Sequence, residues 1–171
     1  MISEKIQDAI NEQIKWELYS AYLYLSMSAQ FVSDNLPGFA NWMRVQAQEE
    51  VAHAMKFYDF LNERGGKVEL RPVDGPPTTW DSPLAMFQEG YAHEQIVTGR
   101  IGDLMDLARE ERDHASEIFF QWFVTEQVEE EASADEVVQE LKRIQDNSGA
   151  LFMLDRELGQ RVFTPPAAEG A

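Results

Sequence analysis

The sequence contains no cysteine, which excludes disulfide bonds and zinc–thiolate sites and permits a reducing compartment. It also has no uninterrupted apolar run of about 18 residues, so we expect no segment to span a membrane. The opening stretch MISEKIQDAINEQ has no basic segment followed by an apolar one, so we expect no signal peptide. From these absences we expect a cytoplasmic protein that does not bind membranes.

Basic residues are scarce as well. The chain has 14 lysines and arginines and 31 aspartates and glutamates, which gives a net charge of −17. A protein of that charge repels phosphate backbones and attracts cations, so nucleic acid is not an expected partner. Acidic residues often serve only solubility, and the informative ones are those that lie where solubility does not need them.

The hydrophobic pattern predicts an all-α protein, with apolar residues recurring at a helical period in four long segments. The expected helices cover residues 3–34, 37–64, 83–109, a segment between EERDH (110–114) and DNSG (146–149), and about 150–161. Ser3 and Ser82 are expected N-caps, and Ser133 with Glu136 reads as a capping box at a bend in the fourth helix.

Two helical pairs with short turns, joined by one long connection at residues 67–80, predict a four-helix bundle with one long crossover connection. The predicted fifth helix is short and C-terminal. The 171 residues suffice for one domain with an ordinary core. We expect that domain to span residues 1–163 and residues 164–171 to form a flexible tail.

Each long helix carries an acid on its apolar face when residues are placed at about 100° intervals. Glu17 lies on the first face, Glu50 and His53 on the second, and Glu94 on the third. Glu49 lies at the edge of the second face. The fourth face is expected to run through Ala115, Phe119, Trp122 and Phe123 to Glu126 and Glu130, flanked by Gln127 and Glu129.

These acids lie at similar depths in their helices, so at roughly 1.5 Å per residue they meet near one level of the bundle. Several ionised carboxylates in an apolar interior are costly, and few basic residues share their faces. A multivalent cation neutralises several of them at once. Carboxylates with one imidazole favour iron or manganese, leave zinc possible and disfavour calcium. Glu50 could bridge two such ions, and a pair of redox-active iron ions could activate dioxygen or peroxide.

Each residue also has a structural interpretation when it is taken alone. An E-x-x-H pair such as Glu50 and His53 occurs on many helices by chance, and a core histidine is usually structural. TEQVEEEA (125–132) could be a solvated acidic run. Tyr24, seven residues after Glu17 on the same face, is more often a core tyrosine than a redox one. The convergence of four helices at one level favours the metal hypothesis.

Four elements at these spacings, Glu17, Glu50-x-x-His53, Glu94 and Gln127-x-x-Glu130, resemble the ferroxidase centre of the bacterial non-haem ferritins. The resemblance covers essentially residues 1–161 and includes the long crossover and the short fifth helix of the ferritin-like fold. It implies an iron-storage protein that oxidises Fe(II) with O2 or H2O2. It further implies a homo-oligomer, a hollow octahedral cage of two dozen subunits that stores ferric mineral.

The resemblance also implies roles for individual residues. One iron would be held by Glu17, Glu50 and His53, with Glu50 bridging. The second would be held by Glu50, Glu94 and Glu130, with Gln127 adjacent and Tyr24 beside the centre. A third, looser iron site is implied for Glu49, Glu126, Glu129 and Glu130.

Related families fit less well. Bacterioferritins repeat E-x-x-H on a second helix, where this chain has Gln127-x-x-Glu130 without a histidine. They also carry a haem-ligating methionine near the position of Ala52, so no haem is expected here, although Met55 is close by. One alternative remains a di-iron carboxylate oxidase or peroxide-detoxifying protein that does not store iron. Another is a metal-free bundle with a protonated acidic core.

Overall fold

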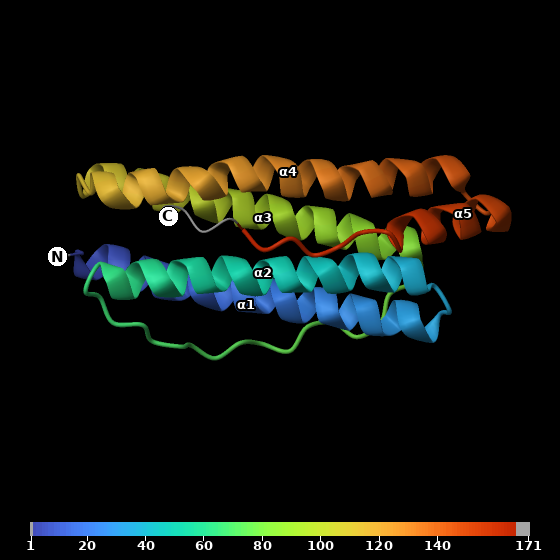
Figure 1. Ribbon diagram of the computed structural model, residues 1–171, viewed down its shortest axis with the longest axis horizontal. Helices are drawn as coiled ribbons and strands as arrows, with labels where there is room; N and C mark the ends of the chain where they lie inside the picture. Colours follow the sequence, from blue (N-terminus) through green and yellow to red (C-terminus); the bar gives the residue numbers. More distant parts are fainter. Residues whose placement is uncertain (1, 167–171) are drawn as a thin grey trace.

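The computed structural model describes residues 2–166, and helices account for most of them (Figure 1). The elements in chain order are α1 (Glu4–Ser33), α2 (Pro37–Glu63), α3 (Pro83–Glu110), α4 (His114–Ile144) and α5 (Ser148–Leu158). No strand occurs among the described residues. The predicted all-α class is confirmed. Of the predicted tail, residues 167–171 lie outside the described part of the chain.

Two of the expected N-caps, Ser3 and Ser82, are confirmed. The Ser3 side chain accepts from the Ile6 N–H at the start of α1, and Ser82 accepts from Ala85 N–H at the start of α3. The fifth helix begins earlier than expected, because Asn147 caps it at Ser148, and it ends at Leu158, directly before Gly159.

The predicted capping box within the fourth helix is wrong. Helix α4 continues without interruption through residues 131–136, so Ser133 and Glu136 form no capping box. This stretch holds neither glycine nor proline. Ala134 and Val137 are buried on its inner side, so continuing the helix keeps apolar surface out of water.

Helices α1 and α2 form one antiparallel pair and α3 and α4 the other, and the pairs lie side by side (Figure 1). The crossover between α2 and α3 runs along the outside of the bundle for much of its length. Helix α5 packs mainly against α2, at the end of the bundle where α1 turns into α2. The chain beyond α5 runs back beside α2.

Helix α5 supplies an N-terminal cap that α2 lacks in its own sequence. Leu36 offers no capping side chain, but the buried Asp155 accepts from the Gly38 N–H at 2.8 Å and the Phe39 N–H at 3.1 Å. A carboxylate at this position also complements the positive end of the helix dipole. Gly38 allows the close approach, because a Cβ there would lie 1.5 Å from the Asp155 carbonyl oxygen.

Two apolar clusters fill the bundle, one on each side of its middle. The cluster toward α5 includes Phe31, Phe39, Met43 and Phe87. The other is built from residues such as Ile10, Phe57, Ile101, Phe120 and Phe123. The buried acids of all four long helices belong to neither cluster. The fold therefore reserves a polar level inside an otherwise apolar core.

Candidate metal centre

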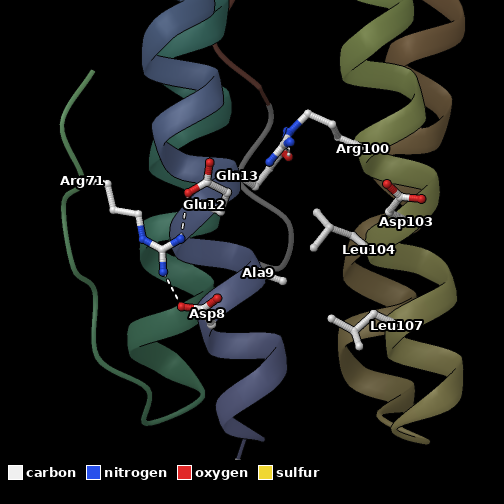
Figure 2. A pocket seen from close by; sticks show the side chains of 9 residues that line it. All are labelled: Asp8, Ala9, Glu12, Gln13, Arg71, Arg100, Asp103, Leu104 and Leu107. Carbon is white, nitrogen blue, oxygen red and sulfur yellow. Dashed lines mark hydrogen bonds and ion pairs between the residues drawn. The ribbon is translucent and has the colours of Figure 1, made fainter. Parts of the chain in front are cut away.

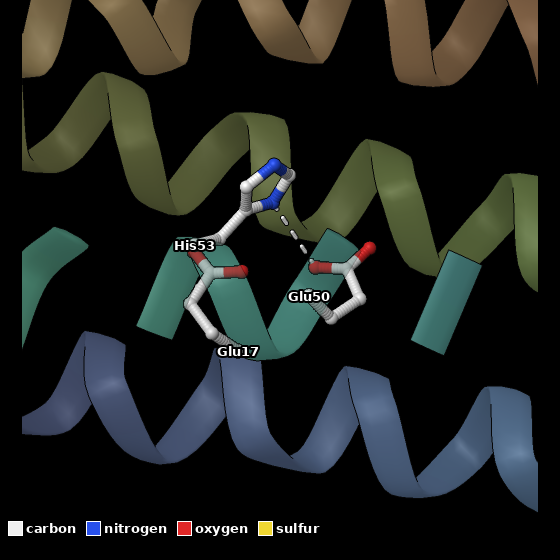
Figure 3. A group of neighbouring side chains, drawn as sticks. All are labelled: Glu17, Glu50 and His53. Carbon is white, nitrogen blue, oxygen red and sulfur yellow. Dashed lines mark ion pairs between the residues drawn. The ribbon is translucent and has the colours of Figure 1, made fainter. Parts of the chain in front are cut away.

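The acids expected to converge do lie together in the middle of the bundle. Glu17 and Glu94 are each 1% exposed, Glu50 and His53 each 2%, and Glu130 6%. Three overlapping groups have ligand atoms within 4.8 Å of one another: Glu17, Glu50 and His53; Glu50, Glu94 and Glu130; and His53, Glu126 and Glu130. Figure 3 shows the first group, where α1 and α2 face each other. Shared members make the three groups one continuous centre.

The expected inner face of the fourth helix is wrong by about one residue. The buried residues of that helix include Ser116, Phe120, Phe123, Gln127 and Glu130. Ala115 and Glu129 are exposed, whereas Phe119, Trp122 and Glu126 are only partly buried. Aromatic residues at 119, 120, 122 and 123 point to several sides of the helix, so the pattern alone does not fix the face. Helix α4 is rotated about its own axis relative to the predicted orientation, so Gln127 lies inside the core and not at its flank.

His53 presents its two ring nitrogens to different carboxylates. Nδ1 lies 3.4 Å from Glu50 Oε2, and Nε2 lies 3.8 Å from Glu126 Oε1. The ring of Trp122 packs edge-on against the imidazole at a centroid distance of 5.5 Å. The histidine can therefore offer one nitrogen to the group with Glu17 and the other to the group with Glu126.

Two glutamines that the sequence analysis missed hold the carboxylates in place. Gln13 Nε2 donates to Glu17 Oε1 at 2.8 Å. Gln46 Nε2 donates to Glu50 Oε1 at 3.1 Å and to Glu130 Oε2 at 2.5 Å. Each glutamine precedes its glutamate by four residues, and that spacing on one helix face was the available signal.

Glu94 is held by two residues that the sequence analysis did name. The Tyr24 hydroxyl donates to Glu94 Oε1, and Gln127 Nε2 donates to Glu94 Oε2 at 3.2 Å. Gln127 also donates to the Thr98 hydroxyl, which itself donates to Glu131 at 2.6 Å. Tyr24 on α1 and Gln127 on α4 thus orient the Glu94 carboxylate on α3.

Burial makes the ionised forms of these acids unfavourable without a cation. It raises the pKa of Glu94 to about 7 and of Glu130 to about 8, and it raises the pKa of Glu50 well above its ordinary value. Burial alone would lower the pKa of His53, but hydrogen bonds to Glu126 and Glu50 outweigh it and raise the pKa. The raised pKa values favour the protonated forms of these three carboxyl groups while no cation is bound, and a cation would replace those protons.

The chemistry of the donors fits a metal ion. Glu17 Oε2 and Gln46 Oε1 are buried and accept no hydrogen bond from any described residue. Such oxygens are costly unless another partner is present. A cation between Glu17, Glu50 and His53 would use the free Glu17 oxygen. The donors are carboxylate oxygens and one imidazole, a set that suits iron or manganese and accommodates zinc.

The residues implied for a third iron site are only partly brought together. Glu126 and Glu130 lie with His53 in one group. Glu49 is bound instead by Arg161, whose Nη2 donates to Glu49 Oε2. The exposed Glu129 belongs to none of the three groups.

A cavity of about 260 Å³ lies on the outer side of the bundle, between α1 and α3 (Figure 2). The Arg71 guanidinium pairs there with Asp8 and Glu12, and Arg100 Nε donates to Gln13 Oε1 at 3.2 Å. Gln13 connects this cavity to Glu17. Three carboxylates, those of Asp8, Glu12 and Asp103, line the cavity together with the two guanidinium groups.

Fold and site define the class of this protein: a four-helix bundle whose centre offers carboxylates and an imidazole to metal ions. Within the described residues, no helix has the length and apolarity needed to cross a membrane. The family model of the ferritin-like domain matches residues 7–144. The chain belongs to the ferritin family, as the sequence motifs predicted.

Similar proteins support the assignment over nearly the full chain. A bacterial non-heme ferritin of Bacteroides fragilis is 45% identical over 161 residues, which cover 94% of this chain and 100% of the relative. One from Staphylococcus aureus is 39% identical over 163 residues, covering 95% and 98%. A solved open-pore ferritin from Archaeoglobus fulgidus is 55% identical, with a TM-score of 0.94 and coverage of 95% and 100%.

Proposed function

We propose that this protein is an iron-storage ferritin with ferroxidase activity. The observation that carries the proposal is the set of three overlapping ligand groups buried at one level of the bundle. Such a centre binds two cations close together and shields them from bulk water. Membership of the ferritin family supports iron as the substrate.

The proposed roles follow the geometry of the groups. Glu17, Glu50 and His53 bind one Fe(II), and Glu50, Glu94 and Glu130 bind the second, so Glu50 bridges the pair. Two Fe(II) ions supply two electrons, which with two protons reduce O2 to H2O2 or H2O2 to water. Carboxylates favour the harder Fe(III) product. Gln127 and Tyr24 keep Glu94 oriented, and Tyr24 lies close enough to the centre to take part in electron transfer.

Storage requires an enclosed volume, which one bundle cannot provide. We infer that subunits assemble into the 24-subunit octahedral cage, that it works in the cytoplasm, and that product iron moves from the centre to the cavity. The net charge of −17, from 31 acidic and 14 basic residues, supports attraction of Fe(II) toward such a cage.

One experiment separates storage from the di-iron oxidase alternative. The purified protein is loaded aerobically with Fe(II), and its elution volume and iron content are measured together. We expect a particle of cage size that carries far more than two irons per subunit. A monomer or dimer that retains at most two irons would refute the storage proposal.

The centre itself is tested by variants under anaerobic conditions. His53→Ala and Glu50→Ala should abolish tight Fe(II) binding and rapid oxidation, because each removes a member of two groups. Glu63→Ala, at an exposed position at the end of α2, is the matched control and should behave like the unmodified protein. Unchanged stoichiometry and rate in both core variants would overturn the assignment of the centre.

A further inference from the structure

Among the described residues, Arg161 is the only one outside the four long helices whose side chain bonds to a carboxylate that the ferritin resemblance implies as an iron ligand. That carboxylate belongs to Glu49. Arg161 lies three residues after α5 ends, in the segment that runs back beside α2 (Figure 1). Its Nη2 donates to Glu49 Oε2 at 2.5 Å. Both side chains are largely shielded, with 22% of Arg161 and 21% of Glu49 exposed.

Further contacts fix the guanidinium in this position. It lies over the Trp42 ring, 4.3 Å from its centroid, and Nη1 donates to the Trp42 carbonyl oxygen at 3.4 Å. The Arg161 carbonyl accepts from Asn41 Nδ2 at 2.9 Å. A mobile surface pair would lack these contacts, so Arg161 is built into the structure as a fixed positive charge beside Glu49.

Burial raises the pKa of Glu49, and the charges of Arg161, His53 and Glu126 also act on it, so Glu49 lies within electrostatic reach of the outer part of the metal centre. His53 directs Nε2 toward Glu126 at 3.8 Å, and these residues form a group with Glu130. Glu49 directly precedes Glu50 on α2 but is not a member of that group. A cation at this third position therefore lacks the Glu49 carboxylate for as long as Arg161 holds it, and it also meets the repulsion of the guanidinium.

We propose that Arg161 determines how many metal ions the centre binds tightly: by occupying Glu49, it restricts tight binding to two ions per subunit. The proposal rests on the proposed function of the centre, since it concerns the third position beside the paired ions. The third position binds strongly only when Glu49 leaves the guanidinium. The C-terminal segment thus acts as an intrinsic competitor for the outer ion.

Zn(II) is the suitable probe, because it accepts carboxylate and imidazole ligands and undergoes no redox reaction. Isothermal titration of the assembled full-length protein should give two tight equivalents per subunit. Arg161→Gln should add a third equivalent that binds roughly tenfold or more tightly than any third equivalent of the unmodified protein, because an ion pair and a cation–π contact no longer compete. Arg156→Gln, an exposed position in α5, is the matched control and should leave the titration unchanged.

The double variant Glu49→Gln/Arg161→Gln separates ligand release from loosening of the tail. It should lose the third equivalent and keep the first two. The proposal is overturned if Arg161→Gln leaves the third equivalent as weak as before, or if the double variant keeps the gain. If the unmodified protein does not bind two equivalents of Zn(II) tightly, the proposed function of the centre is refuted instead. The two failures are therefore distinguishable.

Discussion

Glu94 and Glu130 are buried carboxyl groups whose pKa values rise to about 7 and about 8 from an ordinary 4.5, mainly through burial. Their protonated forms stabilise the metal-free fold fully below about pH 4.5, and this contribution is lost as pH rises through about 7 to 8. We therefore expect the melting temperature of the metal-free protein to fall between pH 6 and pH 9. Each kcal/mol lost lowers it by about 2–4 °C.

The control for this pH dependence is Glu130→Gln, which keeps an acceptor for Gln46 but cannot ionise. It should flatten the pH dependence and melt higher than the unmodified protein at pH 9. Zn(II) should raise the melting temperature of the unmodified protein at that pH and raise that of the variant less. Parallel melting curves for both proteins at every pH would show that Glu130 is not responsible.

Gln46 offers a second prediction, because one amide orients carboxylates on two helices. Gln46→Leu keeps a buried side chain of similar size but removes both hydrogen bonds. Metal affinity should fall by about 10–100-fold, the usual cost of losing a residue that orients ligands. Competition for Zn(II) with a chromophoric chelator measures this, with the exposed Gln48→Leu as control. Equal affinities for the two variants would contradict the role of Gln46.

Residues such as Gln46 and Gln13 explain why the sequence predicted the centre only in part. Buried glutamates and a histidine stand out because an uncompensated charge in a core is costly. A neutral glutamine costs much less to bury, so it gives no comparable signal. The reverse problem affects Glu49, whose partner Arg161 is 112 residues away and becomes visible only in the folded chain.

At the scale of elements, Asp155 joins α5 to the start of α2 by accepting two backbone N–H groups. Asp155→Ala should destabilise the protein by about 0.5–2 kcal/mol, as expected for the loss of a helix cap. Because α5 is then held less firmly, limited proteolysis should cut faster between α4 and α5. Asp146→Ala, at an exposed position in that turn, is the control. Equal melting temperatures and cleavage rates would contradict this role.

The first three helices were largely predictable from the sequence, because each has one narrow apolar face. That face also contains a glutamate. The fourth was predicted less well, since aromatic residues surround it near Phe119 and Phe120. Its supposed bend rested on the spacing of Ser133 and Glu136. A capping box forms only where backbone N–H groups lack helical partners, and inside α4 the helix already satisfies them.

For the whole molecule, the net charge of −17 should influence how quickly Fe(II) arrives. Salt screens such a field, since the Debye length at 0.1 M is only about 10 Å. At limiting Fe(II), the initial oxidation rate should fall by about two- to tenfold between 0.05 and 0.5 M NaCl. At saturating Fe(II) it should change little, because the centre is buried. A rate at limiting Fe(II) that does not depend on salt would contradict electrostatic attraction.

Assembly is the level that a single chain predicts least directly. The four-helix bundle buries a core of its own. Exposed apolar residues such as Leu25, Val51 and Phe152 are compatible with contacts between subunits, but they do not define the symmetry of a cage. The proposed cage therefore rests on membership of the family, whereas the metal centre rests on the residues of this chain.

The proposed function requires two metal ions to bind between the four long helices. Crystals grown without metal and soaked anaerobically in Fe(II) would test it most directly, through anomalous diffraction at the iron absorption edge. We predict two peaks in each subunit, one contacted by Glu17, Glu50 and His53 and one contacted by Glu50, Glu94 and Glu130. Iron found only on the surface, with no peak inside the bundle, would refute the proposed two-iron centre.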